Sequence, residues 1–431
     1  MPLSTSTTFK IVLAVSTCLA SFVSWGTHFM PNSFMPSYFR DYAQYELLRN
    51  ETDTNGNVVL TYVHENIYNG LFANVKNVWS ILISFFIGAM VMRWRASRVL
   101  IGSMVLLTLT TMGLTVFVTY WPLFIVRTLQ GLSTPVVHVC SKTIVSRYAS
   151  SLHERSVLVG LVAGCLQLGN EIWPFLGGIM YTYSGNKTLG FALLLPVDCL
   201  ALALLLALDC ILPKHIEQHQ DRRDTIPMSV LSKDPVILTL CFVQTISSLT
   251  YGLILPMLAV WMKVNLNDIS ESKIGLVSLT VIPLYQSGVA VGILLIKVAK
   301  QHVVGIIGVG CSMAGMACIV LSTLAAHHYW LICACFGAIG FAKAVNNHCT
   351  ALLLVVAVQQ NAECRAKYDL TGAYAQAFTM QRLGCHAAWL VGGVLSGFVV
   401  DVSSFEDEDD NEGQYLTAES DPKAYRSMGD Q

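Results

Sequence analysis

Long apolar segments separated by short polar breaks recur along this chain, and they constrain its fold more than any other feature. A segment of about 20 apolar residues is long enough to cross a bilayer as a helix. Inside lipid the backbone must satisfy its own hydrogen bonds, so such segments form helices or closed barrels, and their length favours helices. Charged residues make up only 12% of the chain, against about 25% in soluble domains. The sequence therefore predicts an all-α membrane protein.

The apolar segments predict eleven membrane-spanning helices. We place them at residues 11–30, 67–92, 97–117, 121–145, 156–182, 188–212, 235–262, 273–299, 303–325, 328–358 and 371–400. The first segment follows Lys10 and so also resembles a signal peptide, but no small-residue cleavage site ends it, and we expect a retained span.

The longest connection between spans, residues 213–234, divides six helices from five. We expect an N-terminal six-helix bundle (1–212), a cytosolic linker (213–234), a C-terminal five-helix bundle (235–405) and an acidic disordered tail (406–431). Transporters built from two such halves bind their solute between them, near the middle of the membrane. No twelfth span is recognised, which would place the tail opposite the N-terminus.

Basic residues favour one set of loops, which the positive-inside rule assigns to the cytosol together with the N-terminus. They include Arg93, Arg95, Arg98, Arg147, Arg155, Arg222, Arg223, Lys297 and Lys300. Two glycosylation sequons, at Asn50 and Asn186, fall in loops of the opposite, lumenal side. Charge and sequons therefore predict the same orientation.

Polar side chains inside apolar spans are costly and usually face a water-filled cavity or a partner charge. They include Arg127, Gln130, Glu171, Lys343 and Arg382. Arg127 can hold a carboxylate or an exposed carbonyl. For Glu171 two interpretations stand equal: a proton carrier, or a fixed partner of Arg382 or Lys343.

The segment Arg127-Thr128-Leu129-Gln130-Gly131 is followed by a helix rich in glycine with one proline. Together these segments resemble the vesicular amine and acetylcholine transporters of the major facilitator superfamily. Glycines permit close helix packing, and Pro174 permits a kink. We predict either plain close packing or a conformational hinge at Gly164, Gly169, Pro174, Gly177 and Gly178.

The resemblance implies two bundles that alternately open to each side, exchanging lumenal protons for a cytosolic, amine-like solute across a synaptic or secretory vesicle membrane. It places Lys76 at the family's lysine in helix 2. The expected solute and proton pathway comprises Lys76, Arg127, Gln130, Glu171, Asn347 and Arg382. We expect no cofactor, metal, enzymatic activity or nucleic-acid partner, with a proton gradient as the driving force.

The sequence departs from that family at its membrane carboxylates. The four aligned positions hold uncharged residues, namely Ser24, Leu255, Asn347 and Phe378. Lys76, Arg127, Lys343 and Arg382 then outnumber Glu171 and Asp198, which predicts a positively charged cavity. The alternatives are therefore a symporter or facilitator for an organic anion or zwitterion, and a non-transporting receptor or accessory protein on the same scaffold.

Overall fold

The structure is a computed structural model. It describes residues 7–42, 49–52, 58–61, 65–149, 151–211, 227–254, 262, 270–298, 329–361 and 370–410, with isolated positions between 303 and 317. Most of the predicted span 303–325 and of the linker 213–234, and the tail beyond residue 410, lie outside these residues.

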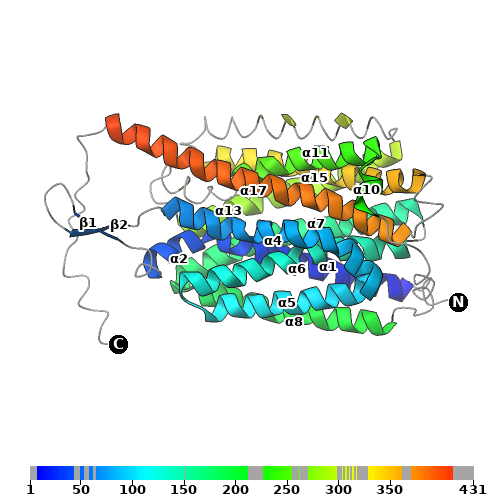
Figure 1. The fold of residues 1–431 in the computed structure, drawn as a ribbon, viewed down its shortest axis with the longest axis horizontal. Coiled ribbons are helices and arrows are strands. Elements are labelled where there is room, and N and C mark those ends of the chain that lie inside the picture. Colours follow the sequence, from blue (N-terminus) through cyan, green and yellow to red (C-terminus); the bar gives the residue numbers. More distant parts are fainter. Residues whose placement is uncertain are drawn as a thin grey trace.

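The first half of the chain forms six long helices that run along a common axis (Figure 1). They are α1 (Thr7–Phe29), α4 (Glu65–Trp94), α5 (Ala96–Val116), α6 (Tyr120–Tyr148), α7 (Leu152–Ser184) and α8 (Lys187–Ile211). A short 3-10 turn, η2 (Met30–Ser33), and the helix α2 (Met35–Tyr42) follow α1. All six predicted helices of this half are present.

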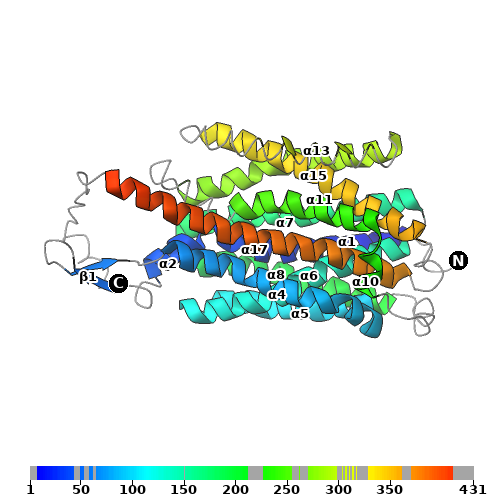
Figure 2. The same ribbon diagram turned by 45° about the horizontal axis from the view of Figure 1, so that its top comes forward.

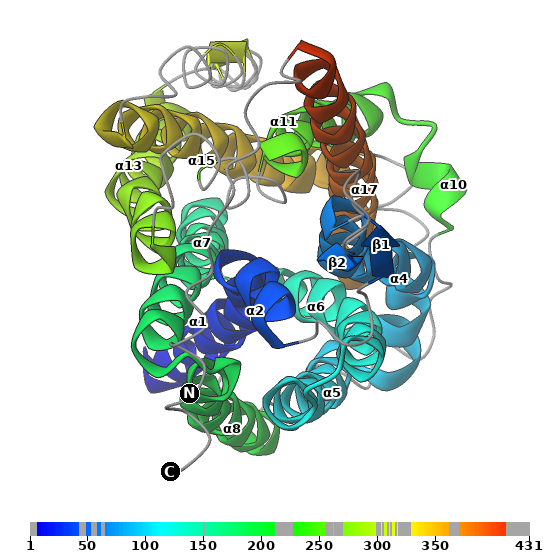
Figure 3. The ribbon, with the colours of Figure 1, turned by 90° about the vertical axis from the view of Figure 1, so that its left-hand side faces the viewer.

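The second half contributes four long helices within the described residues. They are α11 (Pro235–Ile254), α13 (Glu271–Val298), α15 (Tyr329–Gln360) and α17 (Leu370–Asp410), preceded by the short α10 (Met228–Leu231). Viewed along the helix axes, α1, α5, α6 and α8 lie in one group, and α11, α13, α15 and α17 lie in another (Figure 3).

The most extensive contacts between the halves are those of α7 with α13 and of α4 with α17, and α6 also packs against α17. Helices α4 and α17 lie side by side in both lengthwise views (Figures 1 and 2). The contacts of α7 with α13 and of α4 with α17 lie on opposite sides of the molecule (Figure 3).

Nine helices of the described part are long and apolar enough to cross a membrane. They match nine of the predicted spans. The span predicted at 371–400 is also helical, as part of α17, and Gln376, Gln381, Arg382 and His386 on it are buried in the bundle. Large apolar side chains such as Phe86, Leu109 and Phe242 are exposed on the outer surface, as lipid contact requires.

Two details differ from the prediction. The loop after the first span contains an antiparallel pair of strands, β1 (Arg49–Thr52) and β2 (Val58–Thr61), with Arg49 opposite Thr61. This hairpin lies beyond one end of the helices, whereas α10 lies toward the other end (Figure 1). The last helix was expected to end at residue 400, but α17 continues to Asp410, so the first residues of the predicted disordered tail are helical.

Candidate functional site

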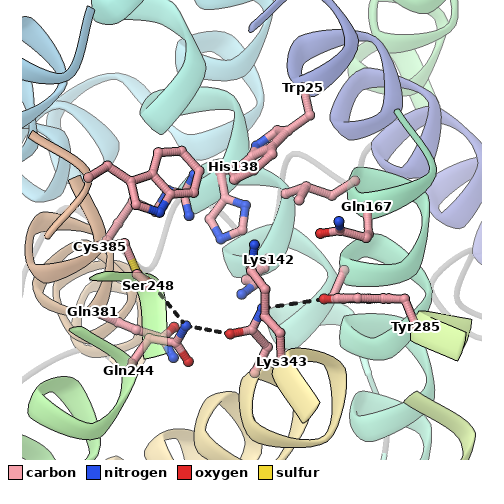
Figure 4. Close-up of a pocket in the computed structure, with 15 residues that line it drawn as sticks. Trp25, His138, Lys142, Gln167, Gln244, Ser248, Tyr285, Lys343, Gln381 and Cys385 are labelled. Carbon is pink, nitrogen blue, oxygen red and sulfur yellow. Dashed lines mark hydrogen bonds between the residues drawn. The ribbon is translucent and has the colours of Figure 1, made fainter. Parts of the chain in front are cut away.

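A small central cavity lies between the two halves of the bundle (Figure 4). Its walls come from α1, α6 and α7 on one side and from α11, α13, α15 and α17 on the other. They are formed by Trp25, His138, Lys142, Ala163, Leu166, Gln167, Gln244, Ser248, Tyr285, Lys343, Asn347, Gln381, Arg382, Cys385 and Trp389. We call this space the central cavity. Its volume is about 40 Å³, room for a few water molecules.

The charged groups that line the central cavity are cationic. Lys142, Lys343 and Arg382 line it, and none of the described lining residues carries a carboxylate. All three are buried. Within the described residues, Nζ of Lys343 and both Nε and Nη2 of Arg382 have no hydrogen-bond partner. The sequence predicted a positively charged cavity, and the lining has that sign, although Lys76 and Arg127 do not line it.

Aromatic rings lie near all three cations, and Nζ of Lys142 is 5.5 Å from the centre of the Phe378 ring. The Arg382 guanidinium carbon lies 4.5 Å from the centre of the Trp25 ring and 5.5 Å from that of Trp389. Nζ of Lys343 lies 3.2 Å from the centre of the Tyr251 ring. The faces of aromatic rings attract cations, so these rings stabilise the protein's own buried charges.

A chain of amide and hydroxyl groups crosses the second half at the cavity wall. Gln244 of α11 donates to the side-chain oxygen of Asn347 on α15, and Nδ2 of Asn347 donates to the Tyr285 hydroxyl at 3.3 Å (Figure 4). Thr350 donates to Oε1 of Gln244 at 2.8 Å. These bonds hold three helices in register and fix the orientation of Asn347.

Arg127 and Gln130 do not line the central cavity; they bind the end of α1. The α-helix ends at Phe29, and the last carbonyls of a helix have no partner within it. Pro31 stands four residues after Thr27 and has no N–H to donate to the Thr27 carbonyl. Arg127 donates to that carbonyl from Nη1 at 3.2 Å, and Gln130 donates to it at 3.1 Å.

Arg127 also binds the next carbonyl of α1, and Lys76 binds it too. Nη2 of Arg127 lies 2.5 Å and Nζ of Lys76 lies 2.7 Å from the His28 carbonyl oxygen. Arg127 further donates to the side-chain oxygen of Gln130. Two cations at a helix C-terminus are also favoured by the helix dipole. Arg127 was expected to hold either a carboxylate or an exposed carbonyl. Within the described residues it binds carbonyls.

The glycine after this motif allows α6 to approach α4. A Cβ at Gly131 would overlap the backbone carbonyl of Lys76, and the Ser80 hydroxyl donates to the Gly131 carbonyl at 2.8 Å. Arg127, Gln130 and Gly131 together therefore pack α6 against both α1 and α4. Lys76 lines a second, smaller cavity of about 20 Å³, which shares Trp389 with the central cavity.

Glu171 of α7 is buried beside the central cavity but does not line it. Its carboxylate accepts hydrogen bonds from the amides of Gln167 and Asn170 on its own helix and from the Ser278 hydroxyl of α13. It interacts electrostatically with Lys343, but the two do not form a direct ion pair within the described residues. Glu171 therefore lies at the contact of the two halves, near the cavity's cations.

The glycines of α7 contact both neighbouring elements. A Cβ at Gly169 would overlap the Phe22 backbone of α1, and one at Gly177 would lie 2.9 Å from Met30 and Phe34. On the opposite face, Gly164 accepts a bond from Gln286 of α13 at 3.1 Å. The close packing expected of these glycines is present; a hinge at Gly164, Gly169, Pro174, Gly177 and Gly178 stays a prediction.

The predicted pathway residues therefore fall into three places. Asn347 and Arg382 line the central cavity; Lys76, Arg127 and Gln130 gather at the end of α1; and Glu171 lies between α7 and α13. Of the positions where the resembled family has carboxylates, Ser24 and Phe378 are buried, and Leu255 lies outside the described residues.

Several cavity residues were not singled out from the sequence. They are Trp25, His138, Lys142, Gln244, Ser248, Tyr285, Gln381 and Trp389. A usable signal was present in polar pairs four residues apart, such as His138 with Lys142 and Gln244 with Ser248, because that spacing places both side chains on one face of a helix.

The two glycosylation sequons lie in short connections. Asn186 is exposed between α7 and α8, and its side-chain oxygen accepts a bond from the Thr188 N–H at 2.9 Å. Asn50 lies in β1. Glycosylation at both stays a prediction.

Comparison with known proteins agrees with this architecture. Residues 17–385 match the Major Facilitator Superfamily model. The chain is 24% identical over 289 residues to the vesicular acetylcholine transporter of Drosophila melanogaster, covering 66% of this chain and 48% of that protein. It is 26% identical over 289 residues to the synaptic vesicular amine transporter of Rattus norvegicus, covering 65% and 52%.

The chromaffin granule amine transporter of Homo sapiens is 29% identical over 192 residues, covering 44% of this chain and 35% of that protein. The matches span about half of these relatives or less. The family match extends over most of the chain, and helices from both halves of the chain line a central cavity. The chain therefore belongs to the Major Facilitator Superfamily, as a divergent, multi-pass membrane member.

Proposed function

We propose that this protein is a secondary active transporter that moves a small organic solute across a vesicle membrane by alternating access. The observation that carries the proposal is the central cavity, because both halves line it and no single bundle could form it alone. When one half rocks against the other, a site between them becomes accessible first from one side of the membrane and then from the other. The similarity to vesicular acetylcholine and amine transporters supports the vesicle membrane as the location.

Solute entry requires the halves to separate. The cavity measures about 40 Å³, whereas sites for small organic ligands are commonly about 300–1,000 Å³. The contacts of α7 with α13 and of α4 with α17 are the most extensive ones that such a movement must rearrange. At the first contact, a Cβ added to Gly275 would lie 2.7 Å from the Phe175 backbone, beside Pro174.

Glu171 is our candidate for the proton-linked step. It is a carboxylate at the contact of the two halves, held by Ser278 across that contact and influenced by Lys343. A change in its protonation would alter both interactions, and so would couple proton binding to the position of α7 against α13. The side-chain amides of Gln167 and Asn170 can form hydrogen bonds with Glu171 whether its carboxyl group is ionised or protonated, because an amide group both donates and accepts.

The test is uptake into liposomes that contain the purified protein, with an imposed pH gradient. Radiolabelled acetylcholine and benzoate serve as the cationic and anionic solutes. Exchange for protons predicts greater accumulation when the interior is acidic, and symport predicts the reverse. Uptake independent of the gradient would indicate a facilitator, and absence of uptake of either solute would oppose transport and favour the receptor or accessory alternative.

Glu171→Gln tests the assigned residue, and Glu154→Gln is its matched control. Glu154 lies on the same helix and pairs with Lys10 at 2.6 Å, away from the cavity. We expect Glu171→Gln to abolish the dependence on the gradient while Glu154→Gln retains it. Full gradient dependence in Glu171→Gln would refute the role of Glu171.

A further inference from the structure

We propose that the central cavity binds a small organic carboxylate with a flat apolar body, and that Lys343 and Arg382 hold its charge. This inference rests on the proposed transport function and names the class of solute that the same site accepts. It differs from what the names of the similar proteins imply, because those proteins are described as amine or acetylcholine transporters.

The first reason is the unsatisfied cations. Lys343 and Arg382 are each 6% exposed, and their unpartnered nitrogens belong to side chains that line the cavity. A buried charge without a partner is strongly unfavourable. A carboxylate in the cavity would accept hydrogen bonds from both groups, and the planar guanidinium can bind one in a two-pronged geometry.

The second reason is that the aromatic surfaces are already occupied by charge. A cationic amine is recognised by aromatic faces or by a carboxylate. Here the Trp25 and Trp389 rings contact Arg382, and the Tyr251 ring contacts Lys343. An amine entering the cavity would meet rings that already contact cations, and would find no carboxylate among the wall residues that the structure describes.

The nearest acid does not change this balance. Glu171 interacts with Lys343 through space, but its Oε1 already accepts hydrogen bonds from the amides of Gln167 and Asn170, and Ser278 also interacts with its carboxylate. Lys142 adds a third cation on the opposite wall, from α6. The described lining therefore has an excess of positive charge even when Glu171 is counted as ionised.

The remaining walls define the body of the solute. Leu166 and Ala163 of α7 present apolar surface, and Tyr285 presents an aromatic ring, close to the cationic end. Such a wall favours a flat, apolar group attached to the carboxylate. Sugars and extended polyanions lack that apolar surface.

Equilibrium binding to the purified full chain tests the inference with three probes of similar size: benzoate, benzylamine and benzyl alcohol. We expect benzoate to bind at least about tenfold more tightly than either of the others, the effect of one or more charge-assisted hydrogen bonds. Tighter binding of benzylamine, equal binding of all three, or no binding of benzoate would overturn the proposal. This comparison needs no variant.

Substitutions then test whether Lys343 and Arg382 are the side chains that bind the carboxylate. Lys343→Gln and Arg382→Gln should each weaken benzoate binding at least about tenfold and leave benzyl alcohol binding within about twofold. Arg382→Lys and Lys343→Arg keep the charge and should retain a preference for benzoate over benzylamine. The matched control is Lys187→Gln, because Lys187 is also buried but donates to the Leu114 carbonyl at 2.8 Å, outside the cavity.

The outcomes separate this inference from transport itself. Benzoate binding that depends on Lys343 and Arg382, without uptake of any solute into liposomes, would support the carboxylate site and refute transport. Gradient-driven uptake of acetylcholine, unaffected by both Gln variants, would support transport and refute the carboxylate site.

Discussion

Replacing Arg127 by leucine tests whether this arginine stabilises the end of α1. The substitution removes two interhelical hydrogen bonds, to the Thr27 and His28 carbonyls. Interhelical hydrogen bonds in membranes contribute about 1–2 kcal/mol each in model peptides and about 0.6 kcal/mol on average in double-mutant cycles. Gln130 and Lys76 retain one bond to each carbonyl, so neither acceptor is left alone.

We therefore expect Arg127→Leu to lower the free energy of unfolding by about 2 kcal/mol, and Arg127→Lys by about half as much, because lysine keeps one charged donor. The measurement is equilibrium unfolding of the purified chain in mixed micelles of increasing SDS content. Arg93→Leu is the control, since Arg93 is exposed at the end of α4 and should change the free energy by less than about 0.5 kcal/mol.

Pro31→Ala sharpens this test. Alanine restores an N–H four residues after Thr27, which can donate to the Thr27 carbonyl. In that background Arg127→Leu should cost about 1 kcal/mol less than in the parent chain, a coupling that a double-mutant cycle measures. Equal costs in both backgrounds would refute the carbonyl explanation, as would a cost of Arg127→Leu no larger than that of Arg93→Leu.

Three further predictions concern packing and modification. Gly131→Ala should lower the free energy of unfolding by about 1–3 kcal/mol, because its Cβ would overlap the α4 backbone. The same unfolding assay measures this change, and an unchanged free energy would refute the close approach of α6 to α4. Gly275→Ala should slow uptake into liposomes, because it adds a Cβ 2.7 Å from the α7 backbone at the contact of the halves. Gly102→Ala is the control for both, because no atom of the described residues lies within 4 Å of the added Cβ, and it should leave stability and uptake unchanged. Asn50→Gln and Asn186→Gln should each remove one enzymatically cleavable glycan, seen as a step in electrophoretic mobility; unchanged mobility in both would contradict the lumenal assignment of those loops.

The helices were predictable because each span needs a continuous apolar segment, and that requirement appears directly in sequence. The long α17 was found for the same reason, but its end was not, since the polar residues after Asp401 resemble a loop while the helix continues to Asp410. The hairpin was missed because its strands have only four residues each. The Asn55-Gly56 dipeptide between them in sequence is the hairpin signal that could have indicated it.

The functional residues were only partly predictable. A charge inside an apolar span is conspicuous, so Arg127, Lys76 and Arg382 were found, but sequence does not tell which backbone or cavity each one faces. The interhelical partners of Arg127 are main-chain carbonyls, whose only trace in sequence is Pro31. The central cavity joins residues from seven helices, and their proximity arises from packing.

The most direct test of alternating access asks whether Cys385 in the central cavity can be reached from each side of the membrane. This cysteine lines the cavity, is buried, and receives a hydrogen bond from Ser248. In a variant that retains Cys385 alone among the 13 cysteines, a membrane-impermeant thiosulfonate reagent is applied to one face of sealed vesicles at a time. Alternating access predicts that Cys385 is modified from either face, and that a bound solute slows both reactions. Modification from neither face, or from one face only, would contradict it.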